Sequence, residues 1–267
     1  MVFRMCSIGG KIYEGDNQPD DETQLRPKPA DAPISSHQDR AATISESEQL
    51  PISGAKSSSD HTAVPNAPPA DPSVPHFHDA QLQSDLHSSA SEGSAYARTM
   101  NAFLTTLALC HTVLAVTDDS GALQYKAQSP DEAALVQAAA DCGFAFRGKD
   151  KETLRLQTPF TGGDAVEEYE LLHVLDFTSA RKRMSVIVRK VGEGTQNDNR
   201  IFLLCKGADS IIFERLKEGP SDVRAATERH LEYFASSGAC CCRYETGRTL
   251  TRSYRFANTM FGVQGRP

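Results

Sequence analysis

Three short segments of the chain place charged, hydroxyl and aromatic residues at spacings that suit ligand chemistry. They are S-P-D-E-A-A-L-V at 129–136, D-F-T-S-A-R-K-R-M-S-V-I-V-R at 176–189 and L-L-C-K-G-A-D-S-I-I-F-E-R-L at 203–216. Phe177 stands at the end of a predicted strand among carboxylate and hydroxyl neighbours, which is a wet position for a residue that would otherwise fill a core. Lys206 follows an apolar strand and precedes Gly207, so a ligand has room to approach the backbone there.

Each of these residues also has a structural alternative that the sequence leaves open. Phe177 could fill a core, and Lys206 could be a surface lysine whose charged end reaches solvent. The basic triplet at 181–183, taken alone, indicates a solvated turn. Glu132 follows Ser129 by three residues, which is the spacing of a capping box, in which the carboxylate returns to the N–H of the cap residue. One carboxylate cannot fully serve both a cap and a ligand.

Several common catalytic signatures are missing from the sequence. It contains no G-x-x-x-x-G-K-[ST] phosphate loop, no G-x-G-x-x-G, no H-E-x-x-H and no G-x-S-x-G. It also has no D-x-D pair that could seat a nucleophilic aspartate beside an acid partner. The sequence therefore argues against a self-sufficient hydrolase or kinase.

Composition limits the partners and the location. The 267 residues include 28 Lys and Arg against 35 Asp and Glu, which gives a net charge of −7. This acidic balance argues against a dedicated nucleic-acid binder, because neutralising phosphates takes a surplus of Lys and Arg. The longest apolar stretch, at 102–116, is too short and too polar to span a bilayer, and the first residues lack the apolar run of a signal peptide. We therefore expect no membrane span and a cytosolic location.

The seven cysteines give no sign of a metal site. Three of them are consecutive at 240–242, without the C-x-x-C spacing or the partner histidines of a zinc site. The isolated cysteines are expected to be small buried hydrophobes in a reducing compartment.

Composition also divides the chain into four parts. Residues 16–95 hold ten of the 14 prolines and few large apolar residues, so we expect a disordered insertion there. Order is expected to return over 96–238, about 140 residues, which suffices for one core. Residues 239–267 show no sustained period, and we predict no fold for them. Residues 1–15 form a short separate segment.

Within the ordered part, apolar periodicity and turn residues predict alternating helices and strands. Helices are expected at the start of 100–116, over 133–142 with its start at Ser129 and Pro130 and its stop at Gly143, over 208–216, and from Pro220 onward. Strands are expected at the end of 100–116 and at 123–127, 167–176, 183–190 and 200–205, with a hairpin loop at 192–199 and the last strand buried on both sides.

Together the three segments resemble the nucleotide-binding domain of the phospholipid-translocating P-type ATPases, the lipid flippases, because they occur in the family's order at matching distances. The resemblance covers about 103–238. The segment M-V-F-R-M-C-S-I-G-G-K-I-Y at 1–13 is similar to the family segment that directly follows the phosphorylation motif D-K-T-G-T-L-T, and that motif is absent from the sequence. The resemblance implies an α+β fold, with a mainly antiparallel sheet flanked by helices and the nucleotide at one open face.

The resemblance assigns roles to five residues. In the family this domain holds ATP and delivers its terminal phosphate to an aspartate on a neighbouring domain. Phe177 would stack on adenine, a contact of about 1–3 kcal/mol that needs no particular base edge. Ser179 would donate a hydrogen bond, Lys182 would offset phosphate charge, Lys206 would lie in the nucleotide pocket, and Glu132 would lie near the adenine ring.

The resemblance also assigns a structural role and fails at one place. His111, in the family-like stretch C-H-T-V, is expected to be structural. The family continues after Gly238 with G-L-R-T-L, whose arginine contacts phosphate, whereas this chain continues with alanine and three cysteines. We expect a shifted reading frame or a retained intron from about Ala239 onward, so that Arg243 is no substitute. Losing that contact would weaken nucleotide binding by about 1.5–3 kcal/mol.

The resulting expectation is a fragment of an ATP-driven phospholipid flippase. It would bind ATP weakly, with Mg²⁺ arriving on the nucleotide, and would hydrolyse nothing alone, because the phosphorylated aspartate is missing. The full-length parent would lie at the cytosolic face of a membrane and work with a phospholipid substrate and a regulatory subunit. An alternative is a non-enzymatic interaction module on a vestigial scaffold, whose residues 16–95 bind partners. The missing acidic motif argues against a third reading, a complete soluble phosphatase.

Overall fold

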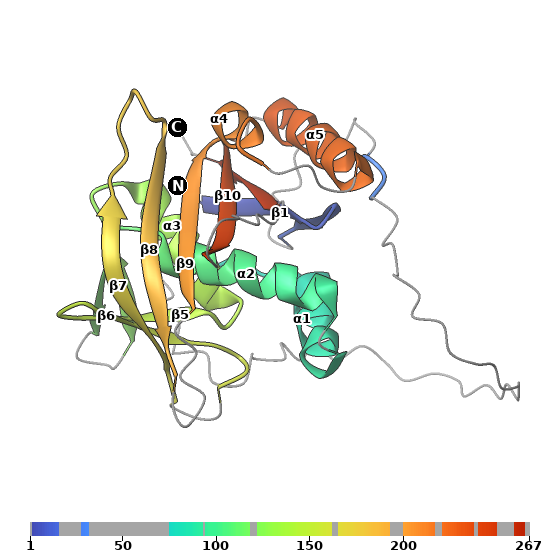
Figure 1. Ribbon diagram of the computed structural model, residues 1–267. Coiled ribbons are helices and arrows are strands. Elements are labelled where there is room, and N and C mark those ends of the chain that lie inside the picture. The colour runs from blue at the N-terminus through green and yellow to red at the C-terminus, as the bar shows by residue number, and fades with distance from the viewer. Residues whose placement is uncertain are drawn as a thin grey trace, which may run out of the picture.

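The computed structural model describes residues 2–15, 28–31, 75–92, 94–117, 122–161, 165–192, 200–216, 221–237, 240–249 and 259–264. Its main feature is a nine-stranded sheet in the order β2-β1-β11-β10-β9-β8-β7-β6-β5, in which every neighbouring pair is antiparallel. Helices flank this sheet (Figure 1). The expected fold class, a mainly antiparallel sheet with flanking helices, is confirmed.

The described elements follow one another from β1 to β11. The strands are β1 (Val2–Ile8), β2 (Lys11–Glu14), β3 (Leu114–Thr117), β4 (Leu123–Lys126), β5 (Ala145–Asp150), β6 (Thr153–Gln157), β7 (Glu167–Leu175), β8 (Arg183–Val191), β9 (Ile201–Ala208), β10 (Cys240–Thr249) and β11 (Thr259–Gln264). The helices are α1 (Ala80–Glu92), α2 (Ala95–Leu109), α3 (Pro130–Asp141), α4 (Asp209–Phe213) and α5 (Ser221–Ser236). Strands β3 and β4 form a hairpin of their own.

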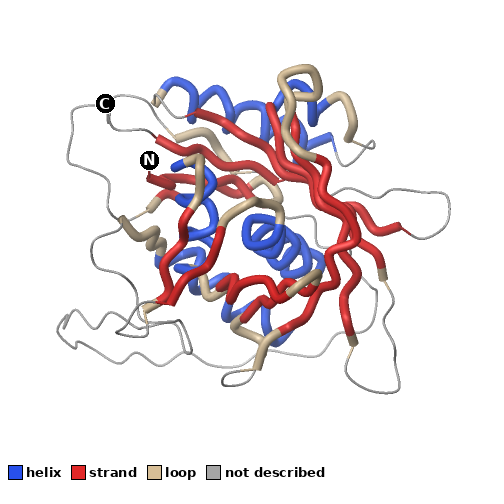
Figure 2. Tube along the Cα trace, turned by 90° about the vertical axis from the view of Figure 1, so that its left-hand side faces the viewer, coloured by secondary structure: helices blue, strands red, loops and turns tan. Residues whose placement is uncertain are grey.

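The main core lies between the sheet and helices α1, α2 and α3. The sheet curves around helices on one side (Figure 2). Helix α2 contributes Phe103, Leu104 and Leu107, which are almost fully buried and recur at the spacing of one helical face. From the sheet, Val186 and Val188 alternate inward along β8 and meet the same cluster. This packing fixes the positions of the strand ends that carry the candidate residues.

Most of the elements expected over 96–238 are present. Helix α2 followed by β3, the short strand β4, helix α3 with its stop at Gly143, strands β7 and β8, and helix α5 are confirmed. Helix α4 is shorter than predicted and ends at Phe213. Strand β9 is not buried on both sides, because Ile201, Phe202 and Leu203 are only half-buried. Part of the predicted hairpin loop at 192–199 lies outside the described residues.

The first residues form a hairpin at one edge of the sheet. Strands β1 and β2 turn through Gly9 and Gly10, whose φ angles of 58° and 88° lie in the left-handed region that glycine adopts readily. Behind the turn, Ile8 and Tyr13 are buried in the main core. The segment 1–15 is therefore part of the domain's core and not a separate piece.

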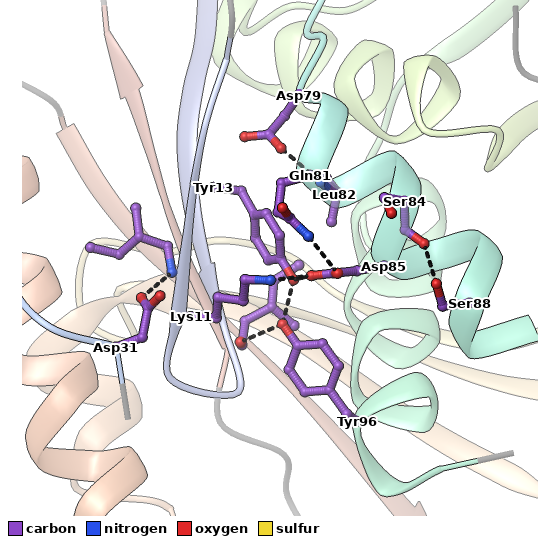
Figure 3. A network of polar contacts seen from close by, with 12 residues as sticks. Lys11, Tyr13, Asp31, Asp79, Gln81, Leu82, Ser84, Asp85, Ser88 and Tyr96 are labelled. Carbon is purple, nitrogen blue, oxygen red and sulfur yellow. Dashed lines mark hydrogen bonds and ion pairs between the residues drawn. The ribbon is translucent and has the colours of Figure 1, made fainter. Parts of the chain in front are cut away.

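A polar network ties this hairpin to α1 and α2 (Figure 3). The hydroxyl of Tyr13 donates to Asp85 Oδ2 at 2.6 Å and lies 2.5 Å from the hydroxyl of Tyr96, and Lys11 Nζ lies 2.5 Å from the same Asp85 oxygen. Burial, followed by contact with Tyr96 and Asp85, raises the pKa of Tyr13 far above its ordinary value, so the phenol remains a hydrogen-bond donor. The Asp85 carboxylate thereby joins α1 to the hairpin, and the Tyr13 hydroxyl joins the hairpin to α2.

The expectation of disorder throughout 16–95 is wrong for residues 75–92. Helix α1 occupies most of this stretch, and Phe77, Leu82 and Leu86 are buried in the main core. Asp79 Oδ1 accepts a hydrogen bond from the backbone N–H of Leu82 at 2.7 Å, as an N-cap does. The low average apolar content of 16–95 led to the expectation of disorder, although three apolar side chains of this stretch are enough to anchor α1 in the core. Most of the remaining insertion, at 16–27 and 32–74, lies outside the described residues.

No fold was assigned from the sequence to the residues after 238, and two stretches of them form strands. Strand β10 pairs with β9, and β11 pairs with both β10 and β1, so that these strands join the hairpin to the rest of the sheet. A strand paired along both edges is held by main-chain hydrogen bonds, which do not require an alternating apolar pattern. The absence of a sequence period therefore did not exclude strands.

None of the helices in the described part of the chain has the length and apolar character that crossing a membrane requires.

Candidate functional site

The three sequence segments meet at one end of the sheet. Strand β7 ends at Leu175, the turn 176–182 follows, and β8 returns alongside it. In the pairing of β8 with β9, Arg183 lies opposite Gly207 and Met184 lies opposite Lys206. The turn that contains Phe177 and Lys182 is therefore next to the end of β9.

Lys206 and Glu132 form an ion pair across this end of the sheet. The Lys206 ammonium contacts Glu132 Oε1, and the two side chains are only 13% and 16% exposed. Burial by itself raises the pKa of Glu132, but attraction to Lys206 and hydrogen bonds from Lys206 and Thr112 outweigh it, so that the pKa is lowered. Glu132 is thus held as a carboxylate, and most of the charge of Lys206 is balanced.

The capping-box alternative for Glu132 is not what the structure shows. Ser129 is the N-cap residue of α3 and Pro130 follows it, as predicted, but the Ser129 side chain makes no capping hydrogen bond. The Glu132 carboxylate instead accepts hydrogen bonds from the hydroxyl of Thr112 at 2.7 Å and its backbone N–H at 3.3 Å. Glu132 therefore contacts Thr112, which is distant in sequence, in place of the cap residue Ser129.

Phe177 does not fill the core. Its side chain is 61% exposed, and its neighbours in the turn, including Ser179, are exposed as well. The exposed ring could stack on a flat ligand, and such stacking would be favourable because it would bury apolar area that is now in contact with water. The structural alternative for Phe177 is therefore wrong.

The basic triplet is a folded turn in which only one member is exposed. Arg181 donates to the carbonyl of Asp176 at 2.9 Å, and Arg183 donates to the carbonyl of Arg181 at 3.3 Å. Lys182 lies between them and is exposed. Both guanidinium groups thus support the turn, while the Lys182 ammonium remains accessible to an anion.

Gly207 lets this turn approach β9. A Cβ atom on Gly207 would lie 2.6 Å from both the carbonyl oxygen of Lys182 and the Cβ of Arg183, which is closer than atoms can pack. The backbone N–H of Ala208 donates to the same Lys182 oxygen at 3.0 Å. Lys182 itself has a φ of 50°, a left-handed conformation that costs a lysine about 1–2 kcal/mol. The close contact with β9 holds the turn in this strained form.

His111 has the structural role that was predicted. Its Nε2 donates to the carbonyl of Ala108 at 2.7 Å and its Nδ1 accepts from the backbone N–H of Val113 at 3.0 Å. Its ring packs edge-on against Phe146 with the ring centres 4.7 Å apart. These contacts fit a neutral imidazole and fix the turn between α2 and β3.

The described residues include no group of three or more His, Cys, Asp or Glu residues arranged to hold a metal ion. The side chains of Cys6, Cys110, Cys142 and Cys205 are buried. Burial raises the pKa of Cys110 to about 12, so its thiol is not a ready nucleophile.

Sequence reasoning missed Thr112, the residue that contacts Glu132 beside the lysine. It lies 20 residues before Glu132, so no local spacing links the two. Its only signal was a hydroxyl directly after a histidine that had been interpreted as structural.

Comparison with known proteins gives one family. Residues 99–229 match the model described as P-type ATPase, cytoplasmic domain N. The chain is 44% identical over 154 residues to probable phospholipid-transporting ATPase 7 of Arabidopsis thaliana, covering 57% of this chain and 11% of that relative. It is 44% identical over 152 residues to phospholipid-transporting ATPase DNF1 of Saccharomyces cerevisiae, covering 55% of this chain and 9% of that relative.

A third relative matches almost the whole chain. Probable phospholipid-transporting ATPase IM of Homo sapiens is 33% identical over 258 residues, which are 96% of this chain and 17% of that relative. The chain therefore spans less than a fifth of the length of each of these relatives. Through residues 99–229 it belongs to the P-type ATPases as a cytoplasmic N domain, with phospholipid-transporting ATPases as its relatives.

Proposed function

We propose that this domain binds ATP for a phospholipid-transporting P-type ATPase. The observation that carries the proposal is the exposed ring of Phe177 on the turn that brings Lys182 beside the end of β9, where Lys206 lies. An aromatic face can stack on adenine, and an exposed ammonium can offset phosphate charge. Ser179, exposed on the same turn, offers a hydroxyl to the ligand.

In this proposal the chain presents ATP and does not cleave it alone. The sequence lacks D-K-T-G-T-L-T, so the aspartate that accepts the phosphate would belong to another part of the whole protein. Mg²⁺ would arrive with ATP, bound mainly by its phosphates and by water. The whole protein would move phospholipid at a membrane whose cytosolic face carries this domain, with a regulatory subunit as its partner.

Titrating Mg-ATP against the 267-residue chain and against Phe177→Ala by calorimetry tests the proposal. Loss of a stacked base should weaken ATP binding by about 1–3 kcal/mol, or roughly 5- to 150-fold. Phe160→Ala is the matched control, because Phe160 is also an exposed phenylalanine, at 44%, but follows β6 near the start of β7, at the opposite end of that strand.

Two results would contradict the proposal. If the wild-type chain does not bind Mg-ATP, the domain is better regarded as an interaction module. If Phe177→Ala and Phe160→Ala bind Mg-ATP as tightly as the wild type, any nucleotide site lies elsewhere.

A further inference from the structure

Thr112 contacts the carboxylate of Glu132 twice, through a single oxygen. Its hydroxyl donates to Oε2 at 2.7 Å, and its backbone N–H donates to the same atom at 3.3 Å. The other oxygen, Oε1, is left to the ammonium of Lys206. The two carboxylate oxygens therefore have separate partners.

The three residues come from three different elements. Thr112 lies between α2 and β3, Glu132 in the first turn of α3, and Lys206 in β9. Glu132 and Lys206 are largely buried, whereas Thr112 is exposed and closes the pair from the solvent side. Turning the carboxylate plane away from its present orientation would pull Oε2 away from the Thr112 hydroxyl and weaken a charge-assisted hydrogen bond, so Thr112 opposes that turn.

The backbone of Thr112 is itself held on both sides. On one side His111 donates to Ala108, and on the other side the same ring accepts from Val113. The N–H of Cys110 also donates to the carbonyl of Thr106 at 2.9 Å and so ends α2. These contacts fix the backbone on both sides of Thr112, and with it the position of the N–H that faces Glu132.

We infer that Thr112 is a positioning residue for the proposed nucleotide site, because it fixes the Glu132 carboxylate that in turn orients Lys206. The inference rests on the proposed function, since the orientation of Lys206 affects binding only if a nucleotide occupies this end of the sheet. Thr112 acts through Glu132 and not by touching the ligand.

The test compares Mg-ATP binding by the full chain and by five variants. Thr112→Val removes the hydroxyl and keeps the shape, and Thr112→Ser restores the hydroxyl. Thr117→Val makes the same substitution at an exposed position of β3. Glu132→Ala, which removes the acceptor, and the double variant Thr112→Val/Glu132→Ala complete a double-mutant cycle.

Thr112→Val should weaken Mg-ATP binding about three- to tenfold, the range for one lost hydrogen bond. Thr112→Ser keeps the hydroxyl and Thr117→Val lies outside the site, so both should bind Mg-ATP within about twofold of the wild type, or ~0.5 kcal/mol. In the Glu132→Ala background, which has no acceptor for the hydroxyl, Thr112→Val should add nothing further. Thermal unfolding of each variant shows whether it is folded, and the rescue by serine separates positioning from general destabilisation.

The possible failures are distinguishable. If the wild type binds, Phe177→Ala weakens binding and Thr112→Val does not, the inference is wrong and the proposed function stands. An equal loss from Thr112→Val in the presence and absence of Glu132→Ala would also overturn it, because Thr112 would then act by another route. If the wild type does not bind Mg-ATP, both the proposed function and the inference fail.

Discussion

The imidazole of His111 is held through both of its nitrogens, one donating and one accepting. Burial lowers its pKa to about 4, with the nearby Lys206 charge acting in the same direction, while the Ala108 carbonyl and Glu132 act in the opposite direction. Protonation would turn the accepting nitrogen into a donor facing the N–H of Val113. The folded chain therefore favours neutral His111 more strongly than the unfolded chain does.

Stability should consequently fall as the pH is lowered. Since the pKa of His111 is below its unfolded value of about 6.5, the unfolded chain binds the proton first, and stability is lost as the pH falls from about 6.5 towards 4. The contribution of His111 is at most about 3 kcal/mol. Urea unfolding between pH 7.5 and pH 4.5 measures it, and His111→Asn should show a smaller pH-dependent loss than the wild type.

His173→Asn, at an exposed position of β7, is the control for removing one imidazole. His230 on α5 should contribute to the remaining slope, because burial lowers its pKa too. Equal slopes for the wild type and His111→Asn would show that His111 is not the proton-linked group.

At the scale of single residues, the family resemblance predicted that Phe177, Ser179, Lys182 and Lys206 belong to one site. The structure brings the segments that carry them together. It could not predict the partner of Glu132. A capping box is visible as a local spacing, whereas Lys206 is 74 residues away and becomes a neighbour only through the fold. The local pattern was therefore the wrong guide for this carboxylate.

At the scale of elements, the conformation of the turn 176–182 depends on its contact with β9. Lys182 in this turn has a left-handed backbone conformation, and its carbonyl oxygen occupies the place that a side chain on residue 207 would need. Hydrogen bonds from Ala208 and within the turn hold it there. Because residue 207 is glycine, the backbone of Lys182 can lie this close to β9.

Gly207→Ala should move the turn and destabilise the domain by about 1–3 kcal/mol, the usual range for overpacking. Urea unfolding gives the stability, and calorimetry gives the accompanying loss of Mg-ATP affinity. Lys182→Gly is the complementary variant, because it removes the left-handed penalty along with the charge. It should keep or raise stability while weakening Mg-ATP binding. A fully stable Gly207→Ala would contradict the close contact described here.

Elements with a strong period or a clear stop signal were predictable, and those held by tertiary contacts were not. Helix α3 carried both Pro130 and Gly143, and its start and stop were found. Helix α1 was missed, although Leu82 and Leu86 are four residues apart and Asp79 precedes them as a cap. Strand β10 had no local signal, since its place depends on the main-chain groups of β9.

At the scale of the whole molecule, the described residues before and after the stretch 32–74 both lie beside the hairpin β1–β2. A Cβ atom on Gly15 would lie 3.1 Å from the ring of Phe77, and that ring packs edge-on against Phe3 with the centres 4.8 Å apart. The Asp31 carboxylate accepts from the N–H of Ile12 at 3.0 Å. The connection therefore leaves and rejoins the domain beside the hairpin β1–β2.

Replacing residues 32–74 by a Gly/Ser linker of about ten residues should be tolerated, because such a linker reaches about 30 Å. The shorter connection should stabilise the fold by about 1 kcal/mol through a smaller loop-closure entropy. Urea unfolding and Mg-ATP calorimetry measure the two effects, and the affinity should stay within about twofold of the wild type, or ~0.5 kcal/mol. A chain that no longer folds would show that this stretch supports the core.

The ion pair between Lys206 and Glu132 closes a span of 74 residues. Helix α3 can form its backbone hydrogen bonds before β9 arrives, but the glutamate cannot acquire its counter-ion until then. During refolding, a probe of that carboxyl group would therefore follow the docking of distant strands and would be insensitive to helix formation. The surroundings of a single carboxylate thus report when β9 has docked beside α3.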